Sequence, residues 1–291
     1  MIVVTGSDGI VGRALCLALR SESIPFLPIT HRRKLHTDPA ALVADLTENI
    51  LSLEKYCDNI TAIVHLAAAV PHSIECPDNE LSAEKTRCMD NNISSLQKLT
   101  NAQVIYMSTC GLYDRSLGMV KHEDDASAIR IESPYFSAKL KGEKLFTDSQ
   151  LATILRLSAP VGSGLKPSVV LGRFIMAARS GAPIQIWGSG SREQNFIDVR
   201  DVADLIMKVL LAPHPCTINV AAKVPTTMVD LAIAVVKAVG KGSFEYSGQV
   251  DPRDGETARY SISKAWELYG WSPKYELAAS CRLLLNEKFD N

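Results

Sequence analysis

A glycine-rich turn near the start of the chain limits the possible folds more than any other feature. The residues from Thr5 to Gly12 read TGSDGIVG, and they stand between the short apolar run Ile2-Val3-Val4 and a segment of helical period. In a strand–turn–helix unit, three glycines at this spacing permit a tight turn, a close approach of the backbone to a pyrophosphate, and close packing of the helix on the sheet. The N-terminus of the helix adds free N–H groups and a partial positive charge. Five residues of the turn are expected to bind a dinucleotide: Gly6, Ser7, Gly9, Ile10 and Gly12.

The first 158 residues alternate short apolar runs with longer segments of helical period. The expected strands are Ile2–Val4, Phe26–Ile29, Ala62–Leu66, Val104–Met107 and Thr153–Leu157. The expected helices are Ile10–Arg20, a run that ends near Leu99, and Pro134–Thr147, which Ser133 would cap. Repeated crossovers of this kind need parallel strands with helices on both faces, since each crossover is right-handed. The sequence therefore predicts an α/β fold built on a Rossmann doubly wound parallel sheet.

The chain of 291 residues is long enough for two lobes, at about 100 to 200 residues per domain. After Ser158, glycines and prolines separate shorter elements, although two further helices are expected at Val199–Leu211 and Thr227–Val239. We therefore expect the two lobes to interleave in sequence. Residues 1–158 and 192–214 are assigned to the dinucleotide-binding Rossmann domain, and residues 159–191 and 215–291 to a smaller α/β lobe that binds substrate.

Charge and composition exclude several other classes of protein. The 31 lysines and arginines balance 32 aspartates and glutamates, so no general field attracts a polyanion and nucleic acid is not an expected partner. No apolar stretch approaches the roughly 18 residues of a membrane span, and the apolar run at the start is too short for a signal peptide. The seven cysteines are scattered without a CxxC pair, which favours reduced thiols over a disulfide framework or a metal site. We expect a cytoplasmic protein that contacts no membrane and holds no metal.

The region after the second strand bears on which dinucleotide binds. Enzymes that use NAD usually place an acidic residue about 20 residues past the glycines, where it holds the ribose 2′-hydroxyl. Here the strand ends without an acid and runs into Arg32 and Arg33, whose guanidinium groups could pair with a 2′-phosphate. We expect NAD(P) as cofactor with a preference for NADP(H); the alternative is that the basic loop is only solvated.

Tyr135 and Lys139 are candidates for catalysis. They lie four residues apart, so they share one face of the expected helix. The charge of Lys139, and that of a nicotinamide if it is oxidised, are expected to stabilise the phenolate of Tyr135 and so to lower the pKa of that phenol. Tyr135 could then exchange a proton with a substrate hydroxyl or carbonyl while hydride moves to or from the cofactor. After the expected strand Val104–Met107, Ser108-Thr109-Cys110 offers a hydroxyl for the same substrate oxygen.

Together these motifs resemble the extended short-chain dehydrogenase/reductase family, the NAD-dependent epimerase/dehydratase group that acts largely on nucleotide sugars. TGSDGIVG is similar to the family's TGxxGxxG, and His65-Leu66-Ala67-Ala68 to its HxAA. The resemblance implies three catalytic residues, Thr109, Tyr135 and Lys139. Cofactor contacts that it implies are Asp45, Leu46, Leu66, Ala67, Ala68, Asn92, Tyr135 and Lys139. The resemblance also implies that an arginine holds the diphosphate of the substrate. The substrate contacts that it implies are Val70, Thr109, Arg192 and Arg253.

Three departures from the family pattern narrow the expected chemistry. Cys110-Gly111 stands where dehydratases carry an Asp-Glu pair, so loss of water is disfavoured, and Cys110 is expected to be a packed thiol. Ala159-Pro160-Val161-Gly162 replaces the usual Asn-Val-Tyr-Gly, which removes an amide that often contacts substrate. Gln194 takes the place of the usual arginine, although Arg192 lies two residues away. The last two departures put the standard sugar pocket in question.

The resemblance implies an NAD(P)-dependent oxidoreductase or epimerase that acts on a nucleotide sugar by hydride transfer, as a 4-keto-sugar reductase or a 4-epimerase. One alternative is a reductase of a hydrophobic carbonyl, against which Arg253 argues because its diphosphate partner would be missing. Another is a non-catalytic NADP(H)-sensing regulator, although such proteins typically lack the Tyr135 and Lys139 pair. The resemblance also implies a homodimer held by the helices that bear Asn91–Leu99 and Tyr135; alternatively, their apolar stripes serve only the monomer core.

Overall fold

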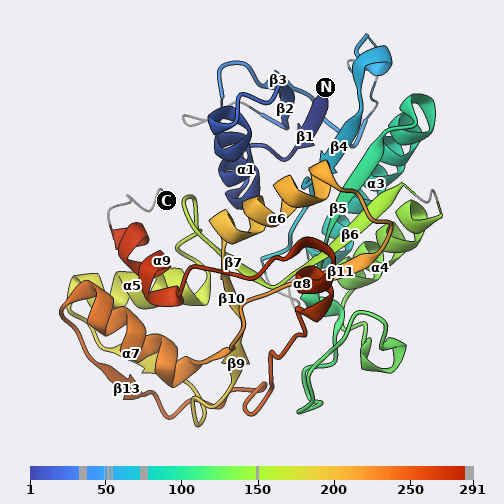
Figure 1. Cartoon of the computed structure of the whole chain (residues 1–291). Coiled ribbons are helices and arrows are strands. Elements are labelled where there is room, and N and C mark those ends of the chain that lie inside the picture. The colour runs from blue at the N-terminus through green and yellow to red at the C-terminus, as the bar shows by residue number, and fades with distance from the viewer. Residues whose placement is uncertain are drawn as a thin grey trace.

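A seven-stranded parallel sheet forms the centre of the larger lobe in the computed structural model (Figure 1), which describes residues 1–32, 38–48, 50, 53, 55–72, 78–148 and 151–285. In sheet order the strands are β11 (Thr217–Val220), β6 (Ala152–Leu157), β5 (Gln103–Thr109), β4 (Ala62–His65), β1 (Ile2–Thr5), β2 (Phe26–Thr30) and β3 (Leu42–Val43). Each neighbouring pair is parallel. The strand order reverses between β1 and β4, which confirms the predicted doubly wound sheet.

Helices cover both faces of this sheet because its strands carry apolar side chains on both sides. Successive residues of a strand point to opposite faces, and Val3 and Val4 are both fully buried in different hydrophobic clusters. Val4 packs with α1 (Ile10–Ser21) and α6 (Val199–Leu211). Val3 packs on the other face with α3 (Asn79–Thr100) and α4 (Pro134–Thr147). Within each pair the two helices also contact each other, so each face of the sheet is covered.

The start of α4 follows from the local sequence. The hydroxyl of Ser133 accepts the N–H of Phe136 at 3.2 Å, and Pro134 takes the first helical position, where no N–H is needed. The predicted bounds of this helix and of α6 are those observed. This start places Tyr135 in the first turn of α4, close to the edge of the sheet where β5 ends.

The smaller lobe, at the lower left of Figure 1, has a hydrophobic core of its own. Phe174, Ile186 and Leu231 are buried together in it. The elements around this core are α5 (Val170–Ser180), α7 (Met228–Val239), α9 (Leu277–Leu285) and the parallel strands β8 (Ile184–Ile186) and β13 (Phe244–Tyr246). Short elements complete the fold: β7 (Ala159–Val161) parallel to β10 (Phe196–Asp198), β9 (Glu193–Gln194) antiparallel to β12 (Thr226–Thr227), helix α8 (Ser263–Tyr269), and the single turns η1 (Cys57–Asn59), η2 (Cys110–Leu112) and η3 (Ala126–Ala128).

One predicted lobe boundary is wrong. The sequence assigns residues 215–291 to the substrate lobe, but β11 pairs with β6 at the edge of the large sheet. Trp271, which follows α8, is also buried in the cluster around Val4, and its indole N–H donates to the carbonyl oxygen of Asp201 at 3.0 Å. A four-residue strand and a single indole carry no periodic signal. Their places are decided by the otherwise unpaired edge of β6 and by the apolar surface of α6.

Membrane, metal and disulfide features can be checked within the described ranges. No helix there is both long and apolar enough to cross a membrane. The same residues contain no group of three or more histidine, cysteine or acidic side chains that could hold a metal ion. The cysteines that the structure describes are free thiols: Cys16, Cys57, Cys88, Cys110, Cys216 and Cys281.

Candidate active site

A cavity of about 630 Å³ runs along the carboxyl ends of β1, β2, β4 and β5, where ligands gather in doubly wound folds. Its lining brings together predicted residues from separate segments: Gly6, Gly9, Ile10 and Gly12, then Asp45 and Leu46, then Leu66, Ala67, Ala68 and Val70, and finally Thr109, Tyr135 and Lys139. The glycine turn and the Tyr–Lys pair therefore share one crevice.

The glycine turn is shaped for a close ligand and not for a side chain. Gly6 has a φ of +65°, and a Cβ atom there would lie 2.9 Å from the backbone nitrogen of Ala67. A Cβ atom at Gly12 would lie 2.2 Å from the carbonyl oxygen of Gly6, so the helix could not pack this close to the turn. Gly9 precedes α1 without any side-chain cap, which leaves first-turn N–H groups for an anion. The residues present therefore fit the diphosphate of a dinucleotide.

Two predicted cofactor residues, Ser7 and Asn92, do not line the crevice but form hydrogen bonds to segments next to it. Ser7 donates its hydroxyl to the carbonyl oxygen of Ile29 at 3.0 Å, which ties the turn to β2. Asn92, on α3, donates its side-chain amide to the carbonyl oxygens of Leu46 and Glu48 at 2.8 and 3.2 Å. Each side chain therefore holds a crevice segment in place.

The end of the crevice near β2 and β3 carries charged side chains of both signs. The Asp45 carboxylate accepts the hydroxyl and the N–H of Thr47 at 2.7 and 2.9 Å, and these hydrogen bonds hold the pKa of Asp45 below its usual value. His31 Nδ1 lies 3.6 Å from the same carboxylate and lines the cavity. Of the two predicted 2′-phosphate contacts, Arg32 is exposed and follows His31 directly, whereas Arg33 lies outside the described residues.

Tyr135 and Lys139 reach the crevice from the first two turns of α4. Tyr135 is 8% exposed, and its backbone N–H donates to Asn79 Oδ1 at 3.1 Å. Lys139 is 3% exposed, and its ammonium donates to the Met107 carbonyl oxygen at 2.8 Å and to the Tyr106 hydroxyl at 3.2 Å. The spacing of four residues thus places a phenol and an ammonium in the lining of one cavity, as expected for a shared helix face.

A buried chain of hydrogen bonds runs beneath this pair. The Tyr106 hydroxyl donates to Asp90 Oδ2 at 2.8 Å, and Asp90 Oδ1 lies 3.1 Å from His65 Nε2. His65 Nδ1 lies 2.7 Å from the hydroxyl of Thr5, which also accepts the N–H groups of the two residues after His65. Burial lowers the pKa of His65, so this histidine belongs to the core. The Tyr106 hydroxyl therefore connects the carboxylate of Asp90 to the ammonium of Lys139.

The side chains of the protein alone do not give the expected lowering of the Tyr135 pKa by Lys139. Burial, and after it the negative charge of Asp90, raise the pKa of Tyr135 well above its usual value. Burial lowers the pKa of Lys139, against the opposing charges of Asp90 and Glu143. The physical reason is that the ammonium donates to two acceptors of β5 while a carboxylate lies beneath both side chains. Tyr135 is therefore held as a neutral phenol.

Thr109 joins the crevice to a second cavity of about 250 Å³. The lining of this second cavity also includes Cys110, Gly111, Arg115, Glu132, Phe136, Gln194, Asn195, Arg253 and Tyr260. A third cavity of about 680 Å³, with Trp187 and Arg192 in its lining, shares Arg253 with the second. The three adjoining cavities lead from Thr109 past both predicted substrate arginines, whereas Val70 lines the first cavity alone.

Cys110 is a packed thiol, as the sequence predicts. It is 1% exposed, and its Sγ donates to the carbonyl oxygen of Arg156 at 3.1 Å. Burial raises the pKa of this thiol well above its usual value, so it stays protonated. Cys110 therefore offers neither a nucleophile nor the acid or base of a dehydratase.

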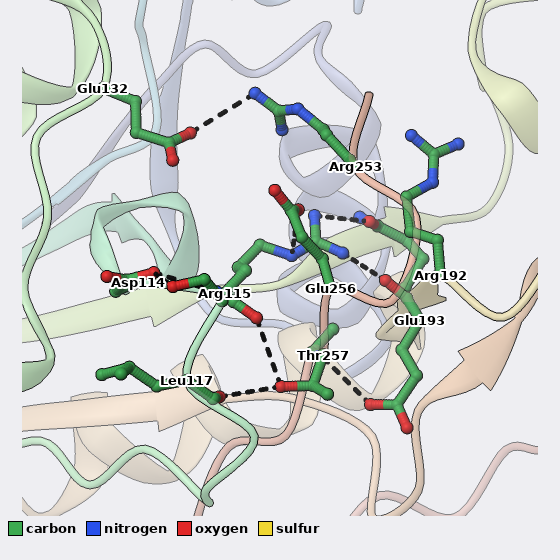
Figure 2. Close-up of polar contacts among 12 residues, drawn as sticks. Asp114, Arg115, Leu117, Glu132, Arg192, Glu193, Arg253, Glu256 and Thr257 are labelled. Carbon is green, nitrogen blue, oxygen red and sulfur yellow. Dashed lines mark hydrogen bonds and ion pairs between the residues drawn. The ribbon is translucent and has the colours of Figure 1, made fainter. Parts of the chain in front are cut away.

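The two predicted substrate arginines are each held by a carboxylate. Arg253 Nη2 lies 3.3 Å from Glu132 Oε2, as Figure 2 shows. Arg192 Nε lies 3.1 Å from Asp251 Oδ2. Since Glu132 comes from the first lobe and Arg253 from the second, the first of these pairs crosses between the lobes. The predicted anion-binding arginines are thus present at the second and third cavities.

A third arginine at this place, Arg115, has no counterpart among the predicted site residues. It follows η2 in an irregular loop and donates to Gln194 Oε1 at 3.1 Å and to the carbonyl oxygen of Glu193 (Figure 2). Its Nε lies 3.5 Å from Glu256 Oε2. The loop has no period that would predict this placement. The one available signal is the missing arginine at position 194, which leaves a place for a cation.

Known proteins resemble this chain along most of its length. The model of the NAD dependent epimerase/dehydratase family matches residues 2–221. A protein of Bacillus subtilis named as an uncharacterized UDP-glucose epimerase is 25% identical over 95% of this chain and 94% of its own length. The dTDP-4-dehydro-6-deoxy-D-allose reductase of Streptomyces bikiniensis is 26% identical over 82% of this chain and 81% of its own. The solved UDP-glucose 4-epimerase of Thermotoga maritima has the same fold, with a TM-score of 0.86 at 19% identity over 97% of this chain and 96% of its own.

Proposed function

Because the chain belongs to the NAD-dependent epimerase/dehydratase family, we propose that it is an NAD(P)-dependent enzyme that acts on a nucleotide sugar, with reduction of a 4-keto sugar favoured over 4-epimerisation. The match over residues 2–221 confirms the predicted family. The observation that carries the proposal is the position of Tyr135, a buried neutral phenol in the same lining as Thr109, where the crevice meets the arginine-bearing cavities.

In this proposal Tyr135 is the proton donor. A phenol with a raised pKa gives its proton to a strong base, such as the alkoxide that develops when a ketone is reduced. Thr109 Oγ1 accepts the N–H of Gly111 at 3.0 Å, so its own hydroxyl proton is available to the same substrate oxygen. When bound, a nicotinamide dinucleotide supplies the hydride. Reduction of a 4-keto sugar consumes the hydride of the cofactor, and we favour it over 4-epimerisation together with the preference for NADP(H) proposed below.

The relatives and the charges of the second lobe support a nucleoside-diphosphate sugar as substrate. The relatives' names include a UDP-glucose epimerase, a dTDP-linked sugar reductase and, at 25% identity, a UDP-glucuronic acid decarboxylase of Arabidopsis thaliana. Arg192 and Arg253 offer two guanidinium groups, which pair with phosphate oxygens through parallel hydrogen bonds. A hydrophobic carbonyl compound would offer no phosphate oxygens to these two guanidinium groups, so that alternative is disfavoured.

A panel of UDP-, dTDP-, GDP- and CDP-sugars tests the substrate class. We expect one of them to raise the melting temperature of the protein in the presence of its dinucleotide, because a ligand that binds only the folded state stabilises it. A dinucleotide that protects alone, with no sugar adding to it, would contradict the assignment. With the matching 4-keto sugar, a reductase consumes the nicotinamide absorbance band, whereas an epimerase shows no net change in that band.

A preference for NADP(H) over NAD(H) is part of the proposal. It is supported by the end of β2, where Thr30, His31 and Arg32 offer no carboxylate to a ribose 2′-hydroxyl, and where His31 lines the crevice. We expect NADPH to bind more tightly than NADH in a titration of protein fluorescence. The variant Arg32→Gln should reduce that difference, with Arg20→Gln on α1 as the control. Tighter binding of NADH by the unchanged protein would end this part of the proposal.

We also propose a cytoplasmic homodimer that pairs α3 and α4 across a two-fold axis. The two helices pack side by side, and α3 exposes Leu81 and Leu99 by 52% and 69%. The competing explanation is that their apolar residues serve the monomer core, where Ile93 and Phe146 already lie. Sedimentation should give twice the chain mass, and Leu99→Glu should give the monomer mass. A monomer at micromolar concentration would contradict the dimer, and recovery of the enzyme outside the cytoplasmic fraction would contradict the location.

A further inference from the structure

Three guanidinium groups, those of Arg115, Arg192 and Arg253, gather at the second and third cavities. Arg115 and Arg253 line the second cavity together, and Arg192 and Arg253 line the third. Burial lowers the pKa of Arg192, and the charges of Arg115 and Arg253 lower it further. Figure 2 shows that the three arginines come from separate segments of the chain. Like charges repel, so this arrangement is favourable when an anion lies among them.

Each arginine of the cluster faces one carboxylate, and among the described residues the buried Nε atoms of Arg115 and Arg192 both lack a hydrogen-bond partner. Glu132 and Asp251 lie 3.3 and 3.1 Å from their arginines. Glu256 lies 3.5 Å from Arg115, and within the described part of the chain neither Arg115 Nε nor Glu256 Oε2 has a hydrogen-bond partner although both atoms are buried. Arg115 therefore has charge and hydrogen-bonding capacity left for a ligand of the cavity that it lines.

The position of Arg115 is fixed by contacts to both lobes. The N–H of Thr257 donates to the Arg115 carbonyl oxygen at 2.9 Å, which pins the loop to the second lobe. Its guanidinium donates to the side chain of Gln194, the residue that stands where the resembled family has an arginine. A glutamine amide carries no charge, so at this point Arg115 brings the cation that position 194 lacks.

We propose that Arg115 is a substrate-binding residue that holds the diphosphate of the nucleotide sugar together with Arg253. The loop after η2 thus supplies the cation that β9 does not carry. Two guanidinium forks from opposite lobes suit a diphosphate, since each fork pairs with two oxygens. Holding both lobes on one anion also fixes the distance between the sugar and Thr109. This inference rests on the proposed function, because it names a residue that binds the proposed substrate.

Calorimetric titration of the dinucleotide-loaded enzyme with inorganic pyrophosphate, and with the nucleotide sugar found in the panel, tests the inference. We expect Arg115→Gln to weaken both affinities about ten- to a hundredfold, the usual cost of a lost hydrogen bond to a charged group. Arg259→Gln is the matched control, because Arg259 pairs with the Glu193 carboxylate nearby but does not line the cavity. The double variant Arg115→Gln/Gln194→Arg should recover most of the lost affinity.

The outcomes separate this inference from the proposed function. Unchanged pyrophosphate affinity in Arg115→Gln, or no recovery in the double variant, overturns the role of Arg115. Weaker binding of UDP-glucuronic acid alone, with UDP-glucose unaffected, assigns Arg115 to a sugar carboxylate and overturns the diphosphate contact. Pyrophosphate binding that depends on Arg115, in a protein that no nucleotide sugar protects, contradicts the proposed substrate class instead. If Arg115→Gln fails to fold, Arg115→Lys keeps the charge without the fork and should lose part of the affinity; full affinity in that folded variant overturns the paired contact.

Discussion

The dinucleotide crevice and the arginine cluster are both suited to phosphate, but they are built from different material. The crevice is formed by backbone, with glycines packed so tightly that a Cβ atom at Gly12 would lie 2.2 Å from a carbonyl oxygen. The cluster is formed by long charged side chains, each tethered by a carboxylate. A backbone site depends on local geometry and tolerates no added atom. A side-chain site depends on charge and on how distant segments meet, so the two should fail in different ways.

The largest expected effect comes from Tyr135, which lies where the two regions meet. Tyr135→Phe removes the proton donor without altering the backbone, so turnover should fall about 10²- to 10⁴-fold. Dinucleotide affinity should stay nearly unchanged, because the ring remains in the crevice lining. The measurement is the rate of nicotinamide absorbance change with the 4-keto sugar, with the exposed Tyr246→Phe as control. Retained turnover would remove Tyr135 from the proposed chemistry.

The crevice should be broken by a single methyl group. Gly12→Ala forces α1 away from the turn, and overpacking of this kind typically costs about 1–3 kcal/mol. We expect the dinucleotide dissociation constant to rise about tenfold or more, since the same displacement moves the first-turn N–H groups. Gly118→Ala is the control, because a Cβ atom there would meet nothing within 4 Å. Binding of pyrophosphate at the arginine cluster should not change, and a parallel loss there would mean that the two regions are not independent.

The buried chain beneath the crevice should set the upper pH limit of reduction. Reduction requires a protonated Tyr135 and a protonated Lys139. The charge of Asp90 raises the pKa of both groups, so Asp90→Asn should lower both. The activity should then begin to fall at a lower pH on the alkaline side. The other ionisable groups that face this pair are His65, Tyr106, Lys85 and Glu143.

A pH profile of kcat/KM distinguishes this electrostatic role of Asp90 from a structural one. Tyr106→Phe breaks the hydrogen bond to Asp90 and keeps the carboxylate charge, so its alkaline limb should move less than that of Asp90→Asn. Equal melting temperatures of the two variants would show that both remain folded. An alkaline limb that stays in place in Asp90→Asn would rule out control by this carboxylate.

Salt should give the smallest effect and should act mainly on the arginine cluster. Between about 0.1 and 1 M salt the Debye length falls from about 10 to about 3 Å, which screens partly exposed charges such as Arg253. We expect nucleotide-sugar affinity to fall roughly threefold to tenfold over this range, because exposed ion pairs contribute only a small free energy. Dinucleotide affinity should fall less, because backbone N–H groups carry that contact. A steeper salt dependence for the dinucleotide would reverse the comparison.

The features that could be predicted from sequence are those encoded within a few consecutive turns. Five of the seven strands of the sheet, the bounds of α4 and the glycine turn follow from apolar period and from three glycines in seven residues. The pairing of Tyr135 with Lys139 follows from the pitch of a helix. In each case the residues that decide the structure are neighbours in the chain.

What only the tertiary structure decided are the contacts between segments that are remote in sequence. Arg115 meets Gln194 across 79 positions, and the indole of Trp271 meets the Asp201 carbonyl across 70. Burial, and after it the carboxylate of Asp90 on another helix, raise the pKa of Tyr135 that local reasoning expects to be lowered. No period in the sequence encodes such pairs, because they depend on how the whole sheet and both lobes pack. Local pattern thus determined the scaffold and the reacting side chains, while packing decided their charge state and the cations around them.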